Sequence, residues 1–216
     1  MKKILLIITV LVCLSGMVQS QDQPSSIGFK PSSYYTFSWN TTFTTGDFNK
    51  WVGNASPAGF DLGGRYFING GLCAGFNISW QRVSEAYGYQ TYYGDNGTAI
   101  TATNYRFTWM VPFQAVVAYH FMPEKMISPY VGLGIGGDYM EHHLLVQEYD
   151  LYKTRWDFSL TPEVGALMKF GYFSQWGALV AFNYKWTTNK IEFTNNVKSG
   201  DLQMLNLKVG LVMIIR

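Results

Sequence analysis

Apolar and polar residues alternate along most of this chain, and that alternation limits the folds open to it more than any other feature. In the segment SYYTFSWNTTF, residues 33 to 43, Tyr35, Phe37 and Trp39 are separated by threonine and serine. Because strand side chains repeat with a period of two, the aromatic residues share one face and the hydroxyl residues the other. A water-soluble sandwich would bury the aromatic face, whereas a membrane barrel would turn it toward lipid.

Eight segments alternate in this way, which predicts an all-β chain. None of them has a convincing 3.6-residue helical period. The sequence is 48% hydrophobic and 17% aromatic, yet after residue 20 it has no apolar run near the roughly 18 to 20 residues of a membrane-spanning helix. We therefore expect eight antiparallel strands near residues 33–44, 59–68, 71–82, 104–121, 129–140, 156–170, 180–186 and 205–215.

The connections between these segments alternate in length. Short connections fall at 69–71, 122–128 and 171–177, and long ones at 45–57, 83–103, 141–154 and 189–201. Short turns at one end and long loops at the other are typical of an outer-membrane barrel. The spacing therefore predicts an eight-stranded antiparallel transmembrane β-barrel, an up-and-down meander with both chain ends on the short-turn side.

The polar face of the strands indicates what fills such a barrel. About eight strands leave an interior just wide enough for side chains, so charged side chains of both signs can form ion pairs there and fill it. Aromatic residues gather toward the segment ends, as in the girdles where rings meet lipid headgroups. We expect the aromatic face to contact lipid and a structural charge network to close the lumen, formed by Asp61, Arg65, Arg106, Asp138, Asp157, Glu163, Lys169, Lys185 and Lys208.

The start of the chain reads as a targeting segment. Lys2 and Lys3 precede an apolar run from 4 to 14 and the small-residue stretch SGMVQS, so we predict a signal peptide over 1–20. A Pro/Ser-rich periplasmic tether over 21–32 and a barrel domain over 33–216 are expected to follow it. Without Lys2 and Lys3, 14 basic residues face 14 acidic ones, and this balance argues against nucleic acid as a partner. Cys73 is then the one cysteine, which excludes an intrachain disulfide.

The later strands resemble a known family. The stretches PYVGLGIGG, TPEVGALMKFG and the final KVGLVMIIR resemble the outer-membrane β-barrel domain of small Gram-negative proteins of the OmpA, OmpX and OmpW kind, over 33–216. Lys208, Gly210, Met213 and Ile215 match the spacing that this family's assembly machinery reads, although family members usually end on an aromatic residue. The resemblance implies a monomer in the cell outer membrane, with lipid, lipopolysaccharide, periplasmic chaperones and the barrel-assembly machinery as partners.

Two histidines near the middle of the chain raise the question of a metal. Glu141, His142 and His143 stand together, with Asp138 nearby, and such side chains can ligate a divalent ion. Adjacent residues of a strand point to opposite faces, so one ion cannot use them together. We predict no metal site and no cofactor.

His120 suggests an enzyme as an alternative function. A histidine with a nearby serine and carboxylate can serve nucleophilic catalysis, and Ser128 and Glu124 are close in the sequence. Their spacing matches no barrel hydrolase or acyltransferase motif. The sequence therefore predicts a protein that is not an enzyme.

The longest connection holds the candidate recognition residues. Tyr87, Tyr89, Tyr92 and Tyr93 lie among Gly, Asn and Thr, a composition common on recognition surfaces; the same tyrosines could equally pair across a hairpin that extends the barrel. We predict an integral outer-membrane barrel whose surface loops serve envelope or contact functions. A narrow channel or small-molecule conduit and a soluble secreted β-barrel or sandwich binder are the alternatives.

Overall fold

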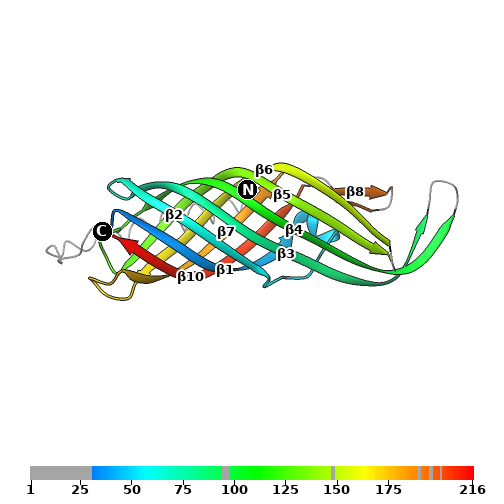
Figure 1. The fold of residues 1–216 in the computed structure, drawn as a ribbon, viewed down its shortest axis with the longest axis horizontal. Coiled ribbons are helices and arrows are strands. Elements are labelled where there is room, and N and C mark those ends of the chain that lie inside the picture. Colours follow the sequence, from blue (N-terminus) through cyan, green and yellow to red (C-terminus); the bar gives the residue numbers. More distant parts are fainter. Residues whose placement is uncertain (1–30, 94–97, 147–148, 189–190, 195–196, 200) are drawn as a thin grey trace, which may run out of the picture.

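The computed structural model describes residues 31–93, 98–146, 149–188, 191–194, 197–199 and 201–216. Eight strands close into a barrel in the order β1-β10-β7-β6-β5-β4-β3-β2 (Figure 1). No helix within the described residues is long and apolar enough to cross a membrane. The wall strands are β1 (Ser33–Thr45), β2 (Gly59–Asn69), β3 (Leu72–Tyr93), β4 (Ala99–His120), β5 (Ile127–Val146), β6 (Tyr149–Lys169), β7 (Trp176–Thr187) and β10 (Gln203–Ile215).

Every neighbouring pair of wall strands is antiparallel, and the first strand pairs with the last. The seam between β1 and β10 runs from Ser33 opposite Ile215 to Thr45 opposite Gln203, so both ends of the barrel domain lie at one end, here called the termini end. The tight turn between β2 and β3 needs a positive φ of 55° at Gly70, which glycine adopts without steric cost. The predicted eight-stranded up-and-down barrel is confirmed.

The two faces of each strand have the predicted environments. On β1, Phe37 and Trp39 are 57% and 59% exposed on the outer wall, whereas Ser38 and Asn40, which alternate with them, are fully buried in the lumen. An exposed aromatic band around a closed barrel suits hydrocarbon, and closure pairs the backbone groups that an open sheet would leave without partners. The fold is therefore that of a transmembrane β-barrel.

Four strands are much longer than the sequence predicted. β3 and β4 have 22 residues, β5 has 20 and β6 has 21, whereas β1, β2, β7 and β10 have 11 to 13. The prediction of long loops at 83–103 and 141–154 was wrong, because most of these residues continue the two hairpins. The alternation that marks a strand fades where solvent wets both faces, so these extensions read as loops.

Two small elements complete the described chain. The 3-10 helix η2 (Gly46–Lys50) follows β1 and lies inside the wall (Figure 1). The strands β8 (Ile191–Thr194) and β9 (Val197–Ser199) form a separate two-stranded sheet.

The interior is divided into three layers. At the end where the long hairpins lie, here called the hairpin end, the first layer is an apolar cluster of Phe48, Trp51, Val52, Val83, Met110, Met140, Leu144, Leu202 and Met204. At the termini end a second apolar cluster contains Tyr34, Phe67, Cys73, Ala118, Tyr130, Leu167, Leu179, Ala181, Val212 and Ile214. The central polar layer between them holds the candidate site.

Candidate functional site

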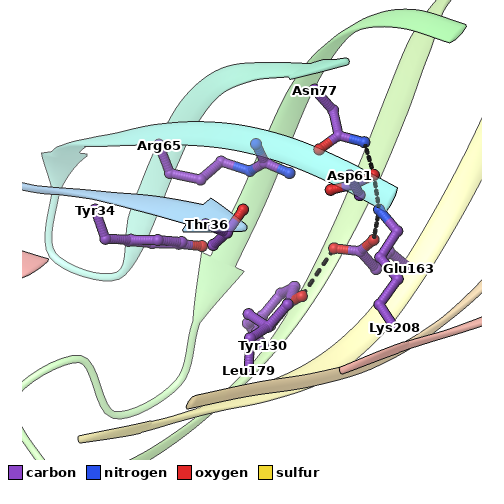
Figure 2. A pocket seen from close by; sticks show the side chains of 9 residues that line it. All are labelled: Tyr34, Thr36, Asp61, Arg65, Asn77, Tyr130, Glu163, Leu179 and Lys208. Carbon is purple, nitrogen blue, oxygen red and sulfur yellow. Dashed lines mark hydrogen bonds and ion pairs between the residues drawn. The ribbon is translucent and has the colours of Figure 1, made fainter. Parts of the chain in front are cut away.

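Lys208 is at the centre of the polar layer. Its Nζ lies 2.9 Å from Oδ2 of Asp61 and 3.0 Å from Oε2 of Glu163, so β10 is tied to β2 and β6 (Figure 2). Asn77 donates to Asp61 at 2.6 Å, and the Tyr130 hydroxyl donates to Glu163 at 2.8 Å. Both carboxylates are thus paired with Lys208 and hydrogen-bonded, as buried charges require.

A second ion pair lies on the other side of the same layer. Lys185 of β7 contacts Asp138 of β5 at 2.5 Å. Ser159 donates to Asp138 at 2.8 Å and accepts a hydrogen bond from Gln114 at 3.0 Å; Gln114 also donates to Thr161 at 2.7 Å. These bonds connect the neighbouring strands β4, β5, β6 and β7 on the inner face of the wall.

Two small cavities remain in the polar layer, one on each side of the Lys208 bridge. The lower cavity, on the side of the termini end, has a volume of about 10 Å³ and is lined by residues that include Tyr34, Arg65 and Glu163 (Figure 2). The upper cavity, on the side of the hairpin end, also has a volume of about 10 Å³ and is lined by residues that include Ser79 and Gln81. The two share Asp61, Asn77 and Lys208, so the bridge separates two polar chambers arranged in series.

Of the remaining residues of the predicted charge network, Lys169 and Asp157 are buried on the inner face away from this centre, whereas Arg65 lines the lower cavity with Asp61 and Glu163. Lys169 donates to the Pro123 carbonyl at 2.8 Å near the termini end. Asp157 lies 3.7 Å from Arg155 toward the hairpin end. Arg65 donates to the carbonyl of Phe76 at 2.6 Å. The predicted set is therefore one central cluster with separate charges above and below it.

Arg106, the last of the predicted charges, marks a feature that the sequence did not reveal. Its guanidinium stacks over Tyr87 at 4.3 Å and over Trp51 at 5.3 Å. Trp51 belongs to residues 46–52, here called the plug, which were predicted as part of a plain loop. Phe48, Trp51 and Val52 are almost fully buried in the hairpin-end cluster. Their apolar character was the one available signal, and it has no strand period.

His120 at the termini end is surrounded by aromatic rings. Its two ring nitrogens face the hydroxyls of Tyr34 at 3.0 Å and Ser128 at 2.9 Å, and its ring stacks on Tyr130 with centroids 4.9 Å apart. Because both nitrogens are engaged by hydroxyls and Ser128 is buried, the group fills the end of the barrel as a packed polar contact.

The structure separates the residues considered for a metal. Asp138 and His142 are buried in the lumen, whereas Glu141 and His143 lie on the outer face. His143 contacts Asp150 through Nδ1 at 3.0 Å and Glu141 through Nε2 at 3.5 Å, so its two nitrogens face different carboxylates. Within the described residues, no group of three potential ligands could hold a metal ion.

The candidate recognition tyrosines lie in strand β3 and not in a loop. The Tyr87 hydroxyl lies 3.1 Å from the Trp51 carbonyl and 2.7 Å from Oε2 of Glu85 and can donate its one proton to either, so it contacts the plug. The pairing of β3 with β4 shifts register between Tyr87 and Tyr89, and Tyr89 is 80% exposed. The side chains of Tyr92 and Tyr93 lie outside the described part.

The long hairpins form one continuous four-stranded surface beyond the closed wall. Pairing of β2 with β3 ends at Gln81, and pairing of β6 with β7 ends at Ser159; β3 to β6 continue together beyond these points (Figure 1). This protruding sheet comprises 83–93, 99–108, 142–146 and 149–158. On the outer face a stack runs from Arg82, next to this sheet, across all four strands: the Arg82 guanidinium over Phe107 at 4.8 Å, Phe107 against His143 at 4.3 Å, and His143 against Tyr152 at 5.8 Å.

The residues of the predicted assembly signal divide between the two faces of β10. Lys208 faces the lumen, and Gly210 approaches the backbone of Phe37 so closely that a Cβ would overlap it. Met213 and Ile215 lie on the outer wall. The terminal Arg216 donates to the Phe173 carbonyl at 2.8 Å and so fastens the strand end to the turn before β7.

Comparison of the sequence with protein-family models and with curated proteins finds no match. Among solved structures, the fold resembles the outer-membrane protein OprG from Pseudomonas aeruginosa, with a TM-score of 0.50 and 10% identity over 88% of this chain and 98% of that one. Ail, the attachment invasion locus protein of Yersinia pestis, has a TM-score of 0.49 and 12% identity over 87% of this chain and 100% of its own. Neisserial surface protein A has a TM-score of 0.49 and 12% identity over 84% of this chain and 96% of its own. The likeness to OprG supports the small outer-membrane barrel fold.

Proposed function

We propose that this chain is a non-enzymatic, monomeric barrel of the cell outer membrane, and that its protruding sheet binds an extended segment of a partner polypeptide. The difference in strand length carries the proposal. A tilted transmembrane strand needs about 9 to 11 residues, so β1, β2, β7 and β10 suffice to cross the bilayer. β3 to β6 have 20 to 22 residues, and their extra length rises above it.

The open edge of β6 is the binding element in this proposal. Thr188 of the chain after β7 donates to the Phe158 carbonyl at 3.2 Å, so the peptide groups of Phe158, and of every second residue before it, face the side of β7. Beyond Ser159 no described strand pairs there. The peptide groups of Tyr152, Thr154 and Trp156 are therefore available to an added strand, which is a common mode of peptide recognition.

The side chains along this edge suit the same purpose. Tyr152 and Trp156 are exposed on its outer face and supply rigid aromatic area beside an added strand. An exposed edge is otherwise a liability that proteins shorten or cover, and here it is long and aromatic. In this orientation the termini end is periplasmic, the outer wall contacts lipid and lipopolysaccharide, and Lys208, Gly210, Met213 and Ile215 meet the assembly machinery after delivery by chaperones.

Peptide binding by edge variants tests the contact function. Thr154→Pro removes an N–H that faces the open edge, while the pairing of β6 with β5 is kept; Thr154→Val keeps the N–H. On an array of extended peptides, the folded protein in detergent micelles should bind a subset, Thr154→Pro should bind about tenfold more weakly, and Thr154→Val should bind like the native chain. Equal binding by Thr154→Pro and Thr154→Val, or no binding by the native chain, contradicts the proposal.

Membrane location has its own test. Cell fractionation should place the chain in the outer membrane, and the folded protein should migrate differently before and after boiling in detergent. Recovery of the processed chain in the soluble periplasmic fraction would contradict the location and favour the soluble binder.

A narrow conduit is the second candidate function, and the two cavities in series favour it. Each cavity has a volume of about 10 Å³, room for about one water molecule, and the Lys208 bridge lies between them. Conductance steps in a planar bilayer would support this function. A silent bilayer under all conditions would remove it.

A further inference from the structure

The open edge of β6 carries different side chains on its two faces. We infer that the partner segment bound at this edge has acidic residues at two alternate positions, which face the inner side of the protruding sheet, and apolar residues on either side of them. This pattern deepens the contact function and rests on it, because it names the chemistry of the polypeptide that the edge would bind.

The protruding sheet has two edges, and they differ. On the β3 edge, the Arg82 amide donates to the Ala58 carbonyl at 2.9 Å, and the Gly53 amide donates to Oε2 of Glu85 at 2.6 Å. The chain between β1 and β2 therefore contacts this edge. At the β6 edge no described strand pairs beyond Ser159, so a partner segment is directed there.

Two cations lie on the inner face of the β6 edge. Because side chains alternate along a strand, Lys153 and Arg155 are on the same face as Asp157, which is buried on the inner side of the wall. Lys153 is exposed, and the side chain of Arg155 is 50% exposed. An added strand would therefore meet positive charge on this face.

The acidic side chains nearby do not reverse this charge. Asp157 lies 3.7 Å from Arg155, but its own side chain is buried one step further down the strand. Glu141 and Asp150 face His143 on the outer side of the sheet. On the inner face of β6 beyond Ser159, two cations thus stand beside one carboxylate, and the edge has a net positive charge there.

The outer face of the same edge is aromatic. Tyr152 and Trp156 are exposed on it, with Thr154 between them. Aromatic side chains pair favourably with aromatic and β-branched side chains that lie opposite them on a neighbouring strand. An added strand therefore suits apolar residues opposite Tyr152 and Trp156.

The spacing of these residues gives the partner segment a defined pattern. Lys153 and Arg155 are two residues apart, so the residues opposite them are also two apart and share the inner face. Opposite charges across neighbouring strands are favourable, and like charges are unfavourable. Between Tyr152 and Trp156 the matching segment reads apolar, acidic, any residue, acidic, apolar. This order is the same in both directions, so it applies to a parallel and to an antiparallel added strand.

Three peptides with the same flanking residues test the pattern. Their cores are Val-Glu-Thr-Glu-Val, Val-Gln-Thr-Gln-Val and Val-Glu-Glu-Thr-Val; in the third, adjacent acidic residues point to opposite faces. Fluorescence anisotropy with the folded full chain in uncharged detergent micelles measures their dissociation constants. The first peptide should bind about eightfold more tightly than the second and about threefold more tightly than the third, because each opposite-charge pair contributes to binding.

Variants of the chain identify the side chains that recognise the acidic residues. The double variant Lys153→Gln, Arg155→Gln should bind the first two peptides equally. Lys125→Gln removes an exposed lysine from the turn before β5 and should keep the preference. Lys153→Gln alone leaves Arg155 beside Asp157 and should reduce the preference about threefold; it replaces the double variant if that chain loses the boiling-dependent mobility of the folded form.

The outcomes separate the acidic pattern from the contact function. If the native chain binds the first two peptides equally and Thr154→Pro weakens both, the edge remains the binding site and the acidic pattern is overturned. If the first peptide is preferred but binds Thr154→Pro with undiminished affinity, the cations capture it without an added strand, and both proposals fail. A preference that is unchanged in the Lys153 and Arg155 variants also overturns the pattern.

Discussion

Single residues in this barrel are constrained by which side of the wall they face. On the lumen side, Lys208 forms ion pairs with two buried carboxylates, and its removal would leave both of them without this partner. On the outer side, Ile135 is 45% exposed and the surroundings require only that it be apolar. The same substitution therefore has different costs on the two faces.

Replacing the central lysine should strongly destabilise the barrel. Lys208→Met is expected to lower the free energy of unfolding by about 3 to 5 kcal/mol, because it breaks a buried ion pair by removing one partner. Urea unfolding in lipid vesicles, followed by tryptophan fluorescence, measures the change. The triple variant Lys208→Met, Asp61→Asn, Glu163→Gln should recover part of the loss; a single variant as stable as the native chain would show that the bridge contributes nothing.

A charge placed on the outer wall should reveal the membrane boundary. Ile135→Arg, near mid-wall on β5, should lower the free energy of unfolding by about 2 to 4 kcal/mol. Leu145→Arg, in the protruding part of the same strand, should lower it by about 0 to 1 kcal/mol. The same unfolding measurement compares them. Equal costs would mean that lipid does not contact Ile135.

At the scale of strands, two prolines interrupt the ladder where regular pairing would be expected. Pairing of β6 with β7 has no partners for Thr161 and Pro162, and pairing of β3 with β4 skips the positions opposite Pro112. The Phe158 carbonyl faces β7, and Pro162 is four residues further on, so its missing N–H faces β7 as well. A ring nitrogen that cannot donate explains the gap.

Restoring this donor should strengthen the pairing of β6 with β7. Pro162→Ala supplies an N–H toward β7 and is expected to stabilise the barrel by about 0.5 to 1.5 kcal/mol, the net value of one hydrogen bond. Hydrogen exchange at the amides of residues 182–186 should slow in the same variant. Exchange there that is unchanged or faster would mean that the gap has another cause.

The whole molecule depends on closure of the ring, and the hairpins above it are additions. Deleting 212–216 removes the pairing partners of residues 33–36 and two members of the termini-end cluster, Val212 and Ile214. Replacing 90–102 by Asn-Gly joins Tyr89 to Thr103, which are paired across the hairpin, and leaves the ring intact. The chain in which 90–102 are replaced should therefore fold, although it loses more residues than the chain that lacks 212–216.

Refolding from urea into detergent micelles tests this dependence without the assembly machinery. The chain lacking 212–216 should give no boiling-sensitive folded band, because its open edge leaves backbone groups without partners at membrane depth. The chain with the Asn-Gly replacement should give that band. A folded band from the first chain, or none from the second, would contradict the dependence on the seam.

Alternation alone determined the fold class, the number of wall strands and which face is apolar. A period of two fixes the face of each side chain, so Phe37 could be placed outside and Asp61, Lys185 and Lys208 inside before their partners were known. Only the closed structure decided which charges meet, because Lys208 reaches Asp61 and Glu163 across the lumen, where contacts depend on shear and register. The same holds for the plug, since burial of Trp51 is decided by a socket built from β3, β4, β5 and β10, and no local pattern in the sequence describes that socket.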